Sequence, residues 1–470
     1  MKKVIFSFLI LFLFNCCTDE VLQPVIEKPI EPEPVKIELF NINEVPEITL
    51  ELELKDWNKF LQNYDLNPKN EKKVVSHFTF KVNGNTIALD SIGLRMKGNT
   101  SRRRPEGVTG EMHISTNTDW HHCHFGLDFS KYKDDQRFEG LDKLNLKWFK
   151  DDATYAREIY CYDLFKRFGC WTTPRASYCK LNIKIKGDAN PAYFGVYAMI
   201  ENIDEIYINS HKEQWGTGIG FLWKGGWSGN NNANFYSTNS MGVEDVSLDA
   251  SKSKYYAYDL KTREEELETA KTELTQFIKD LDSKKGVDFK NWIAQKMDVD
   301  LFLKTYATNI MVGMWDDYWV NGNNFYFYFA PNGKAYFIPY DYDNTLGTSL
   351  IVDNSGTQNI VGWGKYYQRP LIAKILETPE YLVLFKKHIK AIADPKNDLF
   401  AADKSKLRIQ NWQLKIANAV ANDTGEDMII EDKPASWGNQ PNYRLLNGNN
   451  EGGKNGEANF FETKIKAITW

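Results

Sequence analysis

Residues 315–347 read WDDYWVNGNNFYFYFAPNGKAYFIPYDYDNTLG and carry the clearest structural signal in the chain. Two alternating aromatic runs, at residues 323–330 and 334–340, flank the turn sequence PNG at residues 331–333, a pattern typical of a β-hairpin. Because a hairpin brings its two ends together, the polar residues before the first strand and after the second should lie close in space. The stretch therefore predicts a hairpin with a cluster of carboxylate and amide groups at its open end.

That cluster suits metal-assisted phosphoryl transfer. Hard cations such as Mg²⁺ take oxygen ligands, usually one or two carboxylates plus substrate phosphates. In phosphoryl transfer one aspartate handles the nucleophile's proton, an asparagine further on holds metal, and an aspartate beyond a hairpin joins metal to phosphate. Asp317, Asn324 and Asp341 occur in that order. The alternative is that these are ordinary turn residues, since Asp and Asn are common at hairpin ends.

The first third of the chain predicts β-structure. Apolar and polar residues alternate in several short segments separated by polar turns, as in antiparallel strands. A helical pattern at residues 154–169 follows, and two further strands come after it. We expect a mostly antiparallel sheet with one helix packed on it. The strand segments are residues 48–54, 76–82, 91–97, 125–129, 144–149, 177–187 and 193–201.

The rest of the chain is expected to be mainly helical around the hairpin. Helical spacing of apolar residues at residues 263–282 and 298–315 supports this. The predicted fold class is α+β, with an antiparallel β-rich part at about residues 38–205 and a helical part at about residues 206–470. No fixed-period repeat or second linker divides residues 38–470, so we treat them as one unit.

Two features upstream could hold nucleotide phosphates. In GLRMKGNTSRR, at residues 93–103, a predicted strand ends in a small-residue loop that offers backbone amides, Ser101 and Arg102. Lys147 ends another predicted strand, and the helix that follows carries Glu158. This order matches the strand-lysine to helix-glutamate ion pair with which kinases hold nucleotide phosphates. Each feature alone is weak evidence, because surface lysines and arginine-rich loops are common.

The N-terminus predicts export. An apolar run at residues 4–14 ends in LFNC, is shorter than the roughly 20 residues that span a bilayer, and indicates a signal at residues 1–16 with a lipidated Cys16. A plain signal peptide or an uncleaved anchor is the alternative. Residues 17–37 are rich in proline and predict an extended tether. We expect a lipid-anchored protein of the cell envelope, at the outer membrane or the cell surface.

Charge and composition narrow the classes of partner. The net charge of −5 and the pI of about 5.9 provide no global basic field, so a nucleic-acid partner is not expected. A hydrophobic content of 42% is enough for a large core in one big domain or two closely joined lobes.

Several segments together resemble the CotH kinase family. They occur in the family's order over roughly residues 94–347, and the helical segment RPLIAKILETPEYLVLF looks similar as well. The resemblance implies an atypical protein-kinase-like, two-lobed fold that uses ATP and Mg²⁺ or Mn²⁺ to phosphorylate envelope proteins. The matching segments are RMKGNTSRR, FGLDFSKY, YAREIYCYDLFKRFG, YFGVYAMIENIDEIYI, FLWKGG, WDDYWVNGNNFYFYF and FIPYDYDNTLG.

The resemblance also implies residue roles. One of Asp316 and Asp317 would be the catalytic aspartate, with Asp317 favoured; Asn324 would be a metal ligand or its neighbour, and Asp341 and Asp343 the metal-binding pair. The residues expected near the nucleotide are Arg95, Lys97, Ser101, Arg102, Lys147, Glu158, Glu201 and Lys224.

The chain departs from the family pattern at residues 121–124. Many members have a lysine-rich strand there, whereas this chain has HHCH. Such a compact run cannot wrap one ion tetrahedrally, so we expect a surface strand. If a lysine of that strand binds nucleotide in the family, its loss puts kinase activity in doubt, unless Lys147 or Lys224 takes its place.

Two other functions compete. The string FIPYDYDNTLG fits the D-x-D-x-T pattern of haloacid-dehalogenase-type phosphatases, with Asp341 as nucleophile and Asp343 as acid and base. That chemistry needs the first parallel strand of a doubly wound sheet, not a hairpin. Alternatively the protein is a pseudokinase or surface-binding protein: aromatics at residues 226–240 and 319–324 could stack on sugars or peptides. Ca²⁺ at Asp341, Asp343 and Asn344 would then be structural.

Overall fold

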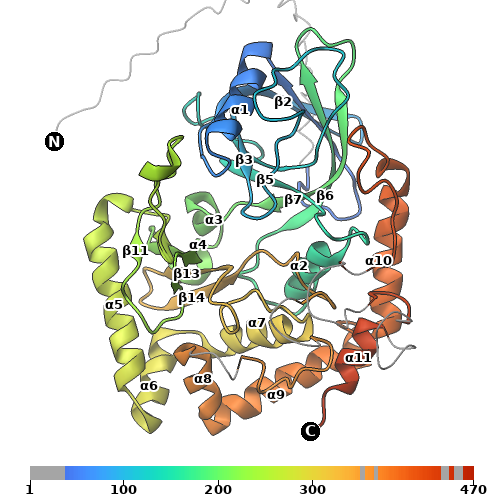
Figure 1. The fold of residues 1–470 in the computed structure, drawn as a ribbon. Helices are drawn as coiled ribbons and strands as arrows, with labels where there is room; N and C mark the ends of the chain where they lie inside the picture. The colour runs from blue at the N-terminus through green and yellow to red at the C-terminus, as the bar shows by residue number, and fades with distance from the viewer. Residues whose placement is uncertain (1–36, 350–354, 365–368, 434, 436–443, 449–458) are drawn as a thin grey trace, which may run out of the picture. The chain divides into compact units, whose positions relative to one another are not determined.

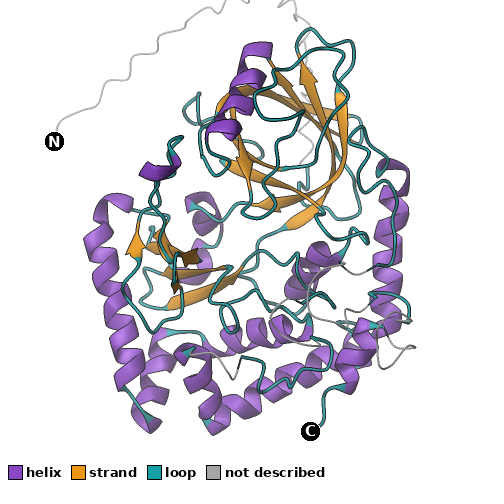
Figure 2. Cartoon of the chain, viewed as in Figure 1, coloured by secondary structure: helices purple, strands orange, loops and turns teal. Residues whose placement is uncertain are grey.

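The N-terminal part of residues 39–470 folds into a closed barrel of seven β-strands (Figure 2). Neighbouring strands pair antiparallel, except that β1 and β6 run parallel and close the barrel. In barrel order the strands are β1 (Glu47–Leu52), β2 (Val74–Val82), β3 (Asn85–Lys97), β4 (His124–Asp128), β5 (Lys143–Trp148), β7 (Ala192–Glu201) and β6 (Ala176–Ile185).

This computed structural model describes residues 37–349, 355–364, 369–433, 435, 444–448 and 459–470. The predicted signal, Cys16 and nearly all of the proline-rich tether lie outside the described residues. None of the described helices is both long and apolar enough to cross a membrane.

The barrel interior is filled by the apolar members of the alternating strands. Ile48, Leu50 and Leu52 of β1 are at most 1% exposed, while the residues between them remain partly accessible. This alternation matches the period of two expected for a strand with one buried face. All seven predicted strand segments of this part are present, but the predicted sheet is closed by the β1–β6 pair.

Helix α1 (Leu54–Leu66) is a feature that the sequence analysis missed. It begins directly after β1 and buries Trp57, Phe60 and Leu61. The Phe60 ring lies 6.2 Å from the ring of Phe125 in β4, so the helix packs against the barrel core. The alternating sequence ITLELEL concealed the helix start, because the strand pattern continues to the helix's first residue.

A second, five-stranded sheet contains the predicted hairpin. The hairpin consists of β13 (Phe325–Phe329) and β14 (Ala335–Pro339), which pair antiparallel as predicted. Three strands that the alternation did not reveal extend it, with β8 directly beside β13. They are β8 (Phe221–Gly225), β12 (Tyr258–Leu260) and β11 (Met241–Gly242), and the short β9 (Trp227–Ser228) and β10 (Asn231–Asn232) form a separate hairpin.

Helices dominate the C-terminal part and surround the second sheet (Figure 1). The most buried is α7, most of whose residues are inaccessible to solvent, as its largely apolar sequence predicts. The predicted α+β class is therefore confirmed, with β-structure first and helices concentrated later. The helices are α2 (Arg157–Arg167), α3 (Glu205–Ser210), α4 (Lys212–Trp215), α5 (Leu267–Ser283), α6 (Gly286–Lys296), α7 (Val299–Met311), α8 (Pro370–Glu377), α9 (Pro379–Ala393), α10 (Ala402–Ile416) and α11 (Phe460–Lys466), with 3₁₀ turns at Ala250–Lys252, Glu264–Glu266, Pro395–Asn397 and Ala417–Ala419.

Phe327, at the centre of the hairpin, provides a test of this core. Its side chain is fully buried, and its ring lies 4.7 Å from that of Phe235 and 5.2 Å from that of Phe277. Phe327→Ala should lower the free energy of unfolding by about 3–5 kcal/mol, because it leaves a cavity that the neighbouring rings cannot fill. Chemical denaturation measures this, and Leu414→Ala at an exposed position should change little. Equal stability of the two variants would contradict the described core.

Candidate functional site

Lys147 lies at the centre of a cluster of carboxylates. The strand β5 presents Lys147, and the first turn of α2 presents Glu158, whose Oε1 lies 2.8 Å from the lysine Nζ. The same Nζ contacts Oδ1 of Asp341 directly and lies 3.7 Å from Oδ2 of Asp343. The ion pair expected between strand lysine and helix glutamate is present, and both aspartates after the hairpin join it.

The charged groups of this cluster shift one another's pKa. Burial opposes the charge of Lys147, but Asp341, Glu158 and Asp343 outweigh it and hold the lysine pKa well above its usual value. Burial also disfavours ionised Asp341, yet the adjacent Lys147 lowers the pKa of that carboxyl. For Asp343, burial together with the negative charges of Asp341 and Glu158 raises the pKa well above its usual value. The cluster thus holds more carboxylates than Lys147 alone compensates.

The backbone after β14 orients the two aspartates. Asp341 has a φ of +65°, a left-handed conformation that aspartate tolerates better than most non-glycine residues. Its N–H donates to the hydroxyl of Tyr162 on α2 at 3.0 Å. Between the aspartates, Tyr342 is buried and packs edge-on against Phe165 at 5.0 Å, so Asp341 and Asp343 are left on the accessible side. Their side chains are 32% and 28% exposed.

Asp316, just before the hairpin, accepts hydrogen bonds from three asparagine side chains. Asn321 donates to Oδ1 at 2.5 Å, and Asn323 donates to the same oxygen at 3.2 Å. Asn324 donates to Oδ2 at 3.0 Å, from a backbone with a φ of +53°. Burial and the charge of Asp341 raise the pKa of Asp316, whereas the hydrogen bonds from the asparagines lower it. Asp316 is therefore part of the same electrostatic cluster.

Asp317 has different surroundings from its neighbour. Its side chain is 3% exposed and accepts bonds from Asn309 Nδ2 at 2.6 Å and from the Val320 N–H at 2.9 Å. Its carbonyl accepts from the N–H groups of residues 321–323. Burial raises the pKa of Asp317 to about 7. Asp317 thus stabilises the turn, whereas Asp316 is the aspartate that is hydrogen-bonded to the asparagines at the hairpin entrance.

Asn321 is a candidate site residue to which the sequence analysis gives no separate role. Kinase catalytic loops place a metal-binding asparagine five positions after the catalytic aspartate, in the pattern D-x-x-x-x-N. Asp316 and Asn321 have this spacing, and their side chains are hydrogen-bonded. Counting five positions from each aspartate would have found the pair, because the residue five after Asp317 is Gly322.

Lys97 and Lys224 lie beside the aspartates. The Lys97 Nζ donates to Asn145 Oδ1 at 2.5 Å and to the Tyr340 hydroxyl at 3.4 Å. The Lys224 Nζ lies 5.7 Å from the centre of the Tyr340 ring. Burial, with the charges of Arg95 and Lys224, lowers the Lys97 pKa well below its usual value. Two of the predicted nucleotide-binding lysines therefore converge on the residue that precedes Asp341.

The glycine loop after β3 is held by its own arginine. Arg102 Nη1 donates to the carbonyl of Pro68 at 2.7 Å, and its Nε donates to that of Gly98. Arg95 forms an ion pair with Glu71 at 3.0 Å, and Ser101 is partly accessible within the loop. Arg102 therefore shapes this loop, whereas Lys97, the last residue of β3, reaches Asn145 and Tyr340 next to Asp341.

Glu201 lies at the end of β7, and its carboxylate binds Arg175. Arg175 donates from Nη2 at 2.5 Å, from Nε at 3.1 Å and from its backbone N–H at 3.0 Å. Within the described part of the chain, Glu201 forms no ion pair with Lys97, Lys147 or Lys224. The structure therefore does not bring it into the lysine–carboxylate cluster.

The expectation of a surface strand at residues 121–124 is wrong. His122, Cys123 and His124 are buried, because this segment enters the barrel at the start of β4. Nδ1 of His124 accepts the Trp148 N–H at 3.0 Å, so the proton of the neutral ring is on Nε2. Burial, with the charge of Lys147, lowers the His124 pKa well below its usual value. A neutral histidine therefore borders the cluster.

The donor set suits a hard divalent cation that arrives with phosphate. Among the described residues, no group of three or more His, Cys, Asp or Glu side chains forms a ready-made metal cage. Mg²⁺ is commonly held by one or two carboxylates plus substrate phosphates. Asp341 and Asp343, with the amide oxygens of Asn321 or Asn324, are the residues of this cluster that could hold such a cation.

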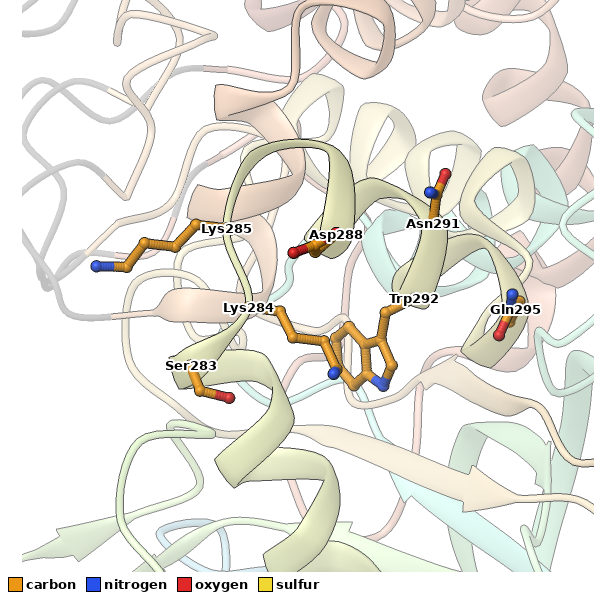
Figure 3. Close-up of a pocket in the computed structure, with 7 residues that line it drawn as sticks. All are labelled: Ser283, Lys284, Lys285, Asp288, Asn291, Trp292 and Gln295. Carbon is orange, nitrogen blue, oxygen red and sulfur yellow. The ribbon is translucent and has the colours of Figure 1, made fainter.

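A separate surface hollow at the junction of α5 and α6 carries none of these groups (Figure 3). It is polar and open to solvent, and its charged groups are two lysines and one aspartate. It is lined by Ser283, Lys284, Lys285, Asp288, Asn291, Trp292 and Gln295.

Comparison with known proteins identifies the family of this chain. A family model described as CotH kinase protein matches residues 94–445, well over half of the chain. The chain belongs to the CotH kinase family. Among curated proteins it is similar to Invasin CotH7 of Rhizopus delemar, 30% identical over 114 residues, which cover 22% of this chain and 19% of that relative. The match thus spans about a fifth of the relative's length.

The topology of the second sheet does not fit the phosphatase alternative. The strand before Asp341 is β14, which lies at one edge of the second sheet and pairs antiparallel with β13. The phosphatase motif needs the end of a parallel strand in a doubly wound sheet. The D-x-D-x-T match is therefore a coincidence of the turn sequence.

The raised pKa of Asp317 predicts a pH-dependent stability. The unfolded chain loses this proton near the ordinary value of 3.8, whereas the folded protein keeps it to about pH 7. Stability from this group is therefore complete below about pH 4 and falls as the pH rises towards 7, by up to about 1.4 kcal/mol per pH unit.

Urea denaturation at pH 5.5, 6.5 and 7.5 measures this slope. Asp317→Asn should flatten it and, by weakening the turn, should also lower stability by about 1–3 kcal/mol. Asp134→Asn, in an exposed loop, should keep the wild-type slope. A wild-type slope in Asp317→Asn would mean that another group titrates.

Proposed function

We propose that the protein is an exported, ATP- and divalent-metal-dependent protein kinase of the CotH family that phosphorylates a protein of the cell envelope. A lipid on Cys16 would anchor it to a membrane, and the proline-rich tether would hold it away from that membrane. The contacts of Lys147 with Glu158, Asp341 and Asp343 carry this proposal. In this view the barrel and the helical part are the two lobes of an atypical kinase-like fold.

The Lys147 contacts support this proposal, because they resemble the arrangement with which kinases hold ATP. In kinases a strand lysine, fixed by a glutamate on the next helix, holds nucleotide phosphates, and an aspartate beyond a hairpin holds the metal. Here Lys147 is fixed by Glu158 and contacts Asp341. Lys224 would supply further positive charge beside Tyr340 for the phosphates, and Lys97, whose pKa burial lowers, would donate hydrogen bonds to them. Asp341, Asp343 and Asn321 or Asn324 would hold the metal, which neutralises phosphate charge when bound.

We assign the role of catalytic base to Asp316. Its two oxygens face the asparagines of the hairpin entrance, whereas those of Asp317 are bonded to Asn309 and Val320 inside the protein. The acceptor hydroxyl would pass its proton to Asp316 as its oxygen bonds to the γ-phosphorus of ATP. The bond from that phosphorus to the bridging oxygen breaks, and ADP leaves with the electron pair.

The test compares Asp316→Asn with Asp317→Asn in the full-length protein. With labelled ATP, Mg²⁺ or Mn²⁺ and an envelope extract, Asp316→Asn should reduce transfer about 10²–10⁴-fold with little change in melting temperature. Asp317→Asn should lose stability first, and its transfer should fall with the folded fraction.

Two outcomes would contradict this proposal. Full activity of folded Asp316→Asn together with its loss in folded Asp317→Asn would reverse the assignment. No label on any protein, with no nucleotide-dependent rise in melting temperature, would exclude the kinase.

A surface-binding protein or pseudokinase is the second candidate. It is favoured by the similarity to a protein named as an invasin and by the exposed aromatic side chains Trp227 and Tyr236. This function predicts that Asp316→Asn leaves surface binding unchanged.

A further inference from the structure

The β9–β10 hairpin lies directly against the loop that carries Asp316. The indole N–H of Trp227 donates to the carbonyl of Asn321 at 3.0 Å, and Asn232 Nδ2 donates to the same carbonyl at 3.2 Å. The Ala233 N–H donates to the carbonyl of Gly322 at 3.1 Å. Three hydrogen bonds therefore fix this hairpin beside the proposed catalytic base.

Trp227 presents a large aromatic surface to solvent at this place. Its side chain is 50% exposed although its N–H is already hydrogen-bonded. Its polar group is therefore used within the protein, while the apolar ring faces outwards. A fixed, exposed aromatic ring can stack on a ligand with little loss of conformational freedom.

The chemistry of this surface differs from that of the neighbouring cluster. The sequence has no charged residue between Lys224 and Glu244, a stretch that consists of Gly, Asn, Ser, Thr, Ala, Val, Met and aromatic residues. The neighbouring lysine–carboxylate cluster, in contrast, contains the charged groups Lys147, Asp316 and Asp341. A ligand that spans both would place an uncharged part on the hairpin and its reacting group at the cluster.

The link between the two surfaces is Asn321. Its carbonyl binds Trp227, and its side-chain amide binds Oδ1 of Asp316 at 2.5 Å. Only Asn321 therefore separates a ligand stacked on Trp227 from Asp316, the group that would accept the ligand's proton. No other exposed large aromatic of the described residues is hydrogen-bonded to the 316–324 loop.

We propose that Trp227 docks the acceptor protein by stacking on an uncharged peptide segment, rich in aromatic or proline residues, beside the hydroxyl that Asp316 deprotonates. This inference rests on the proposed kinase function and names its substrate class. Proline and aromatic side chains have flat apolar faces that pack on an indole ring. Charged side chains beside the acceptor hydroxyl would find no oppositely charged residue on the β9–β10 hairpin.

The test measures steady-state transfer by the full-length protein to short synthetic peptides. Each contains one serine, flanked by tyrosine and proline in one peptide and by glutamate or lysine in the others. Trp227→Ala should raise KM for the uncharged peptide about tenfold, while kcat and KM for ATP stay within about threefold. Trp227→Phe keeps a ring but loses the N–H, so its peptide KM should stay near the wild-type value. Tyr132→Ala, at an exposed aromatic on the barrel, is the matched control.

Several results would overturn the proposal. An unchanged peptide KM in Trp227→Ala, or no preference for uncharged flanks, removes the docking role. A fall in kcat shared by Trp227→Ala and Trp227→Phe means that Trp227 only positions Asn321. Inhibition by chitotriose that is lost in Trp227→Ala points to a sugar ligand instead. If the protein phosphorylates itself but none of the peptides, the docking proposal is wrong and the kinase proposal is kept. If the protein does not bind ATP, both proposals are wrong.

Discussion

The ammonium group of Lys147 is the interaction on which the candidate site depends. It joins β5 of the barrel to α2 through Glu158, and both to the end of β14 through Asp341. β5 and α2 follow one another in the chain, but Asp341 comes from a distant segment, so the cluster exists only when the barrel, the helix and the hairpin are packed together. Without this positive charge, the adjacent carboxylates would repel one another in a poorly solvated place.

In the loop before β13, one of two adjacent aspartates stabilises the turn and the other faces the lysine–carboxylate cluster. Asp317 faces inwards, where Asn309 and backbone amides hold it, and its carbonyl shapes the turn. Asp316 then faces the cluster with the asparagines around it. The β9–β10 hairpin rests on the same turn through Trp227, so one loop fixes the proposed base, the proposed metal-binding amides and the proposed docking surface.

Local patterns predicted much of this structure, and pairings between distant segments could not be predicted. Alternation revealed the barrel strands and the β13–β14 hairpin, and the order of Lys147 and Glu158 revealed their ion pair. The parallel β1–β6 closure was missed, because nothing local in either strand specifies a partner so far along the chain. The five-residue spacing to Asn321 separates Asp316 from Asp317, but sequence could not show which of the two aspartates is buried, since that depends on the turn, nor that His122 and His124 are buried.

The most direct test is the thermal stability of the full-length protein during a titration with ATP and Mg²⁺, compared with Glu158→Gln. Binding to the folded state raises the melting temperature as ligand concentration increases. The account predicts such a rise for the wild type, dependent on Mg²⁺, and a clearly weaker one for Glu158→Gln, in which Lys147 loses its charged partner on α2 and keeps only Asp341 and Asp343. No rise in the wild type, or the same rise in both proteins, would contradict it.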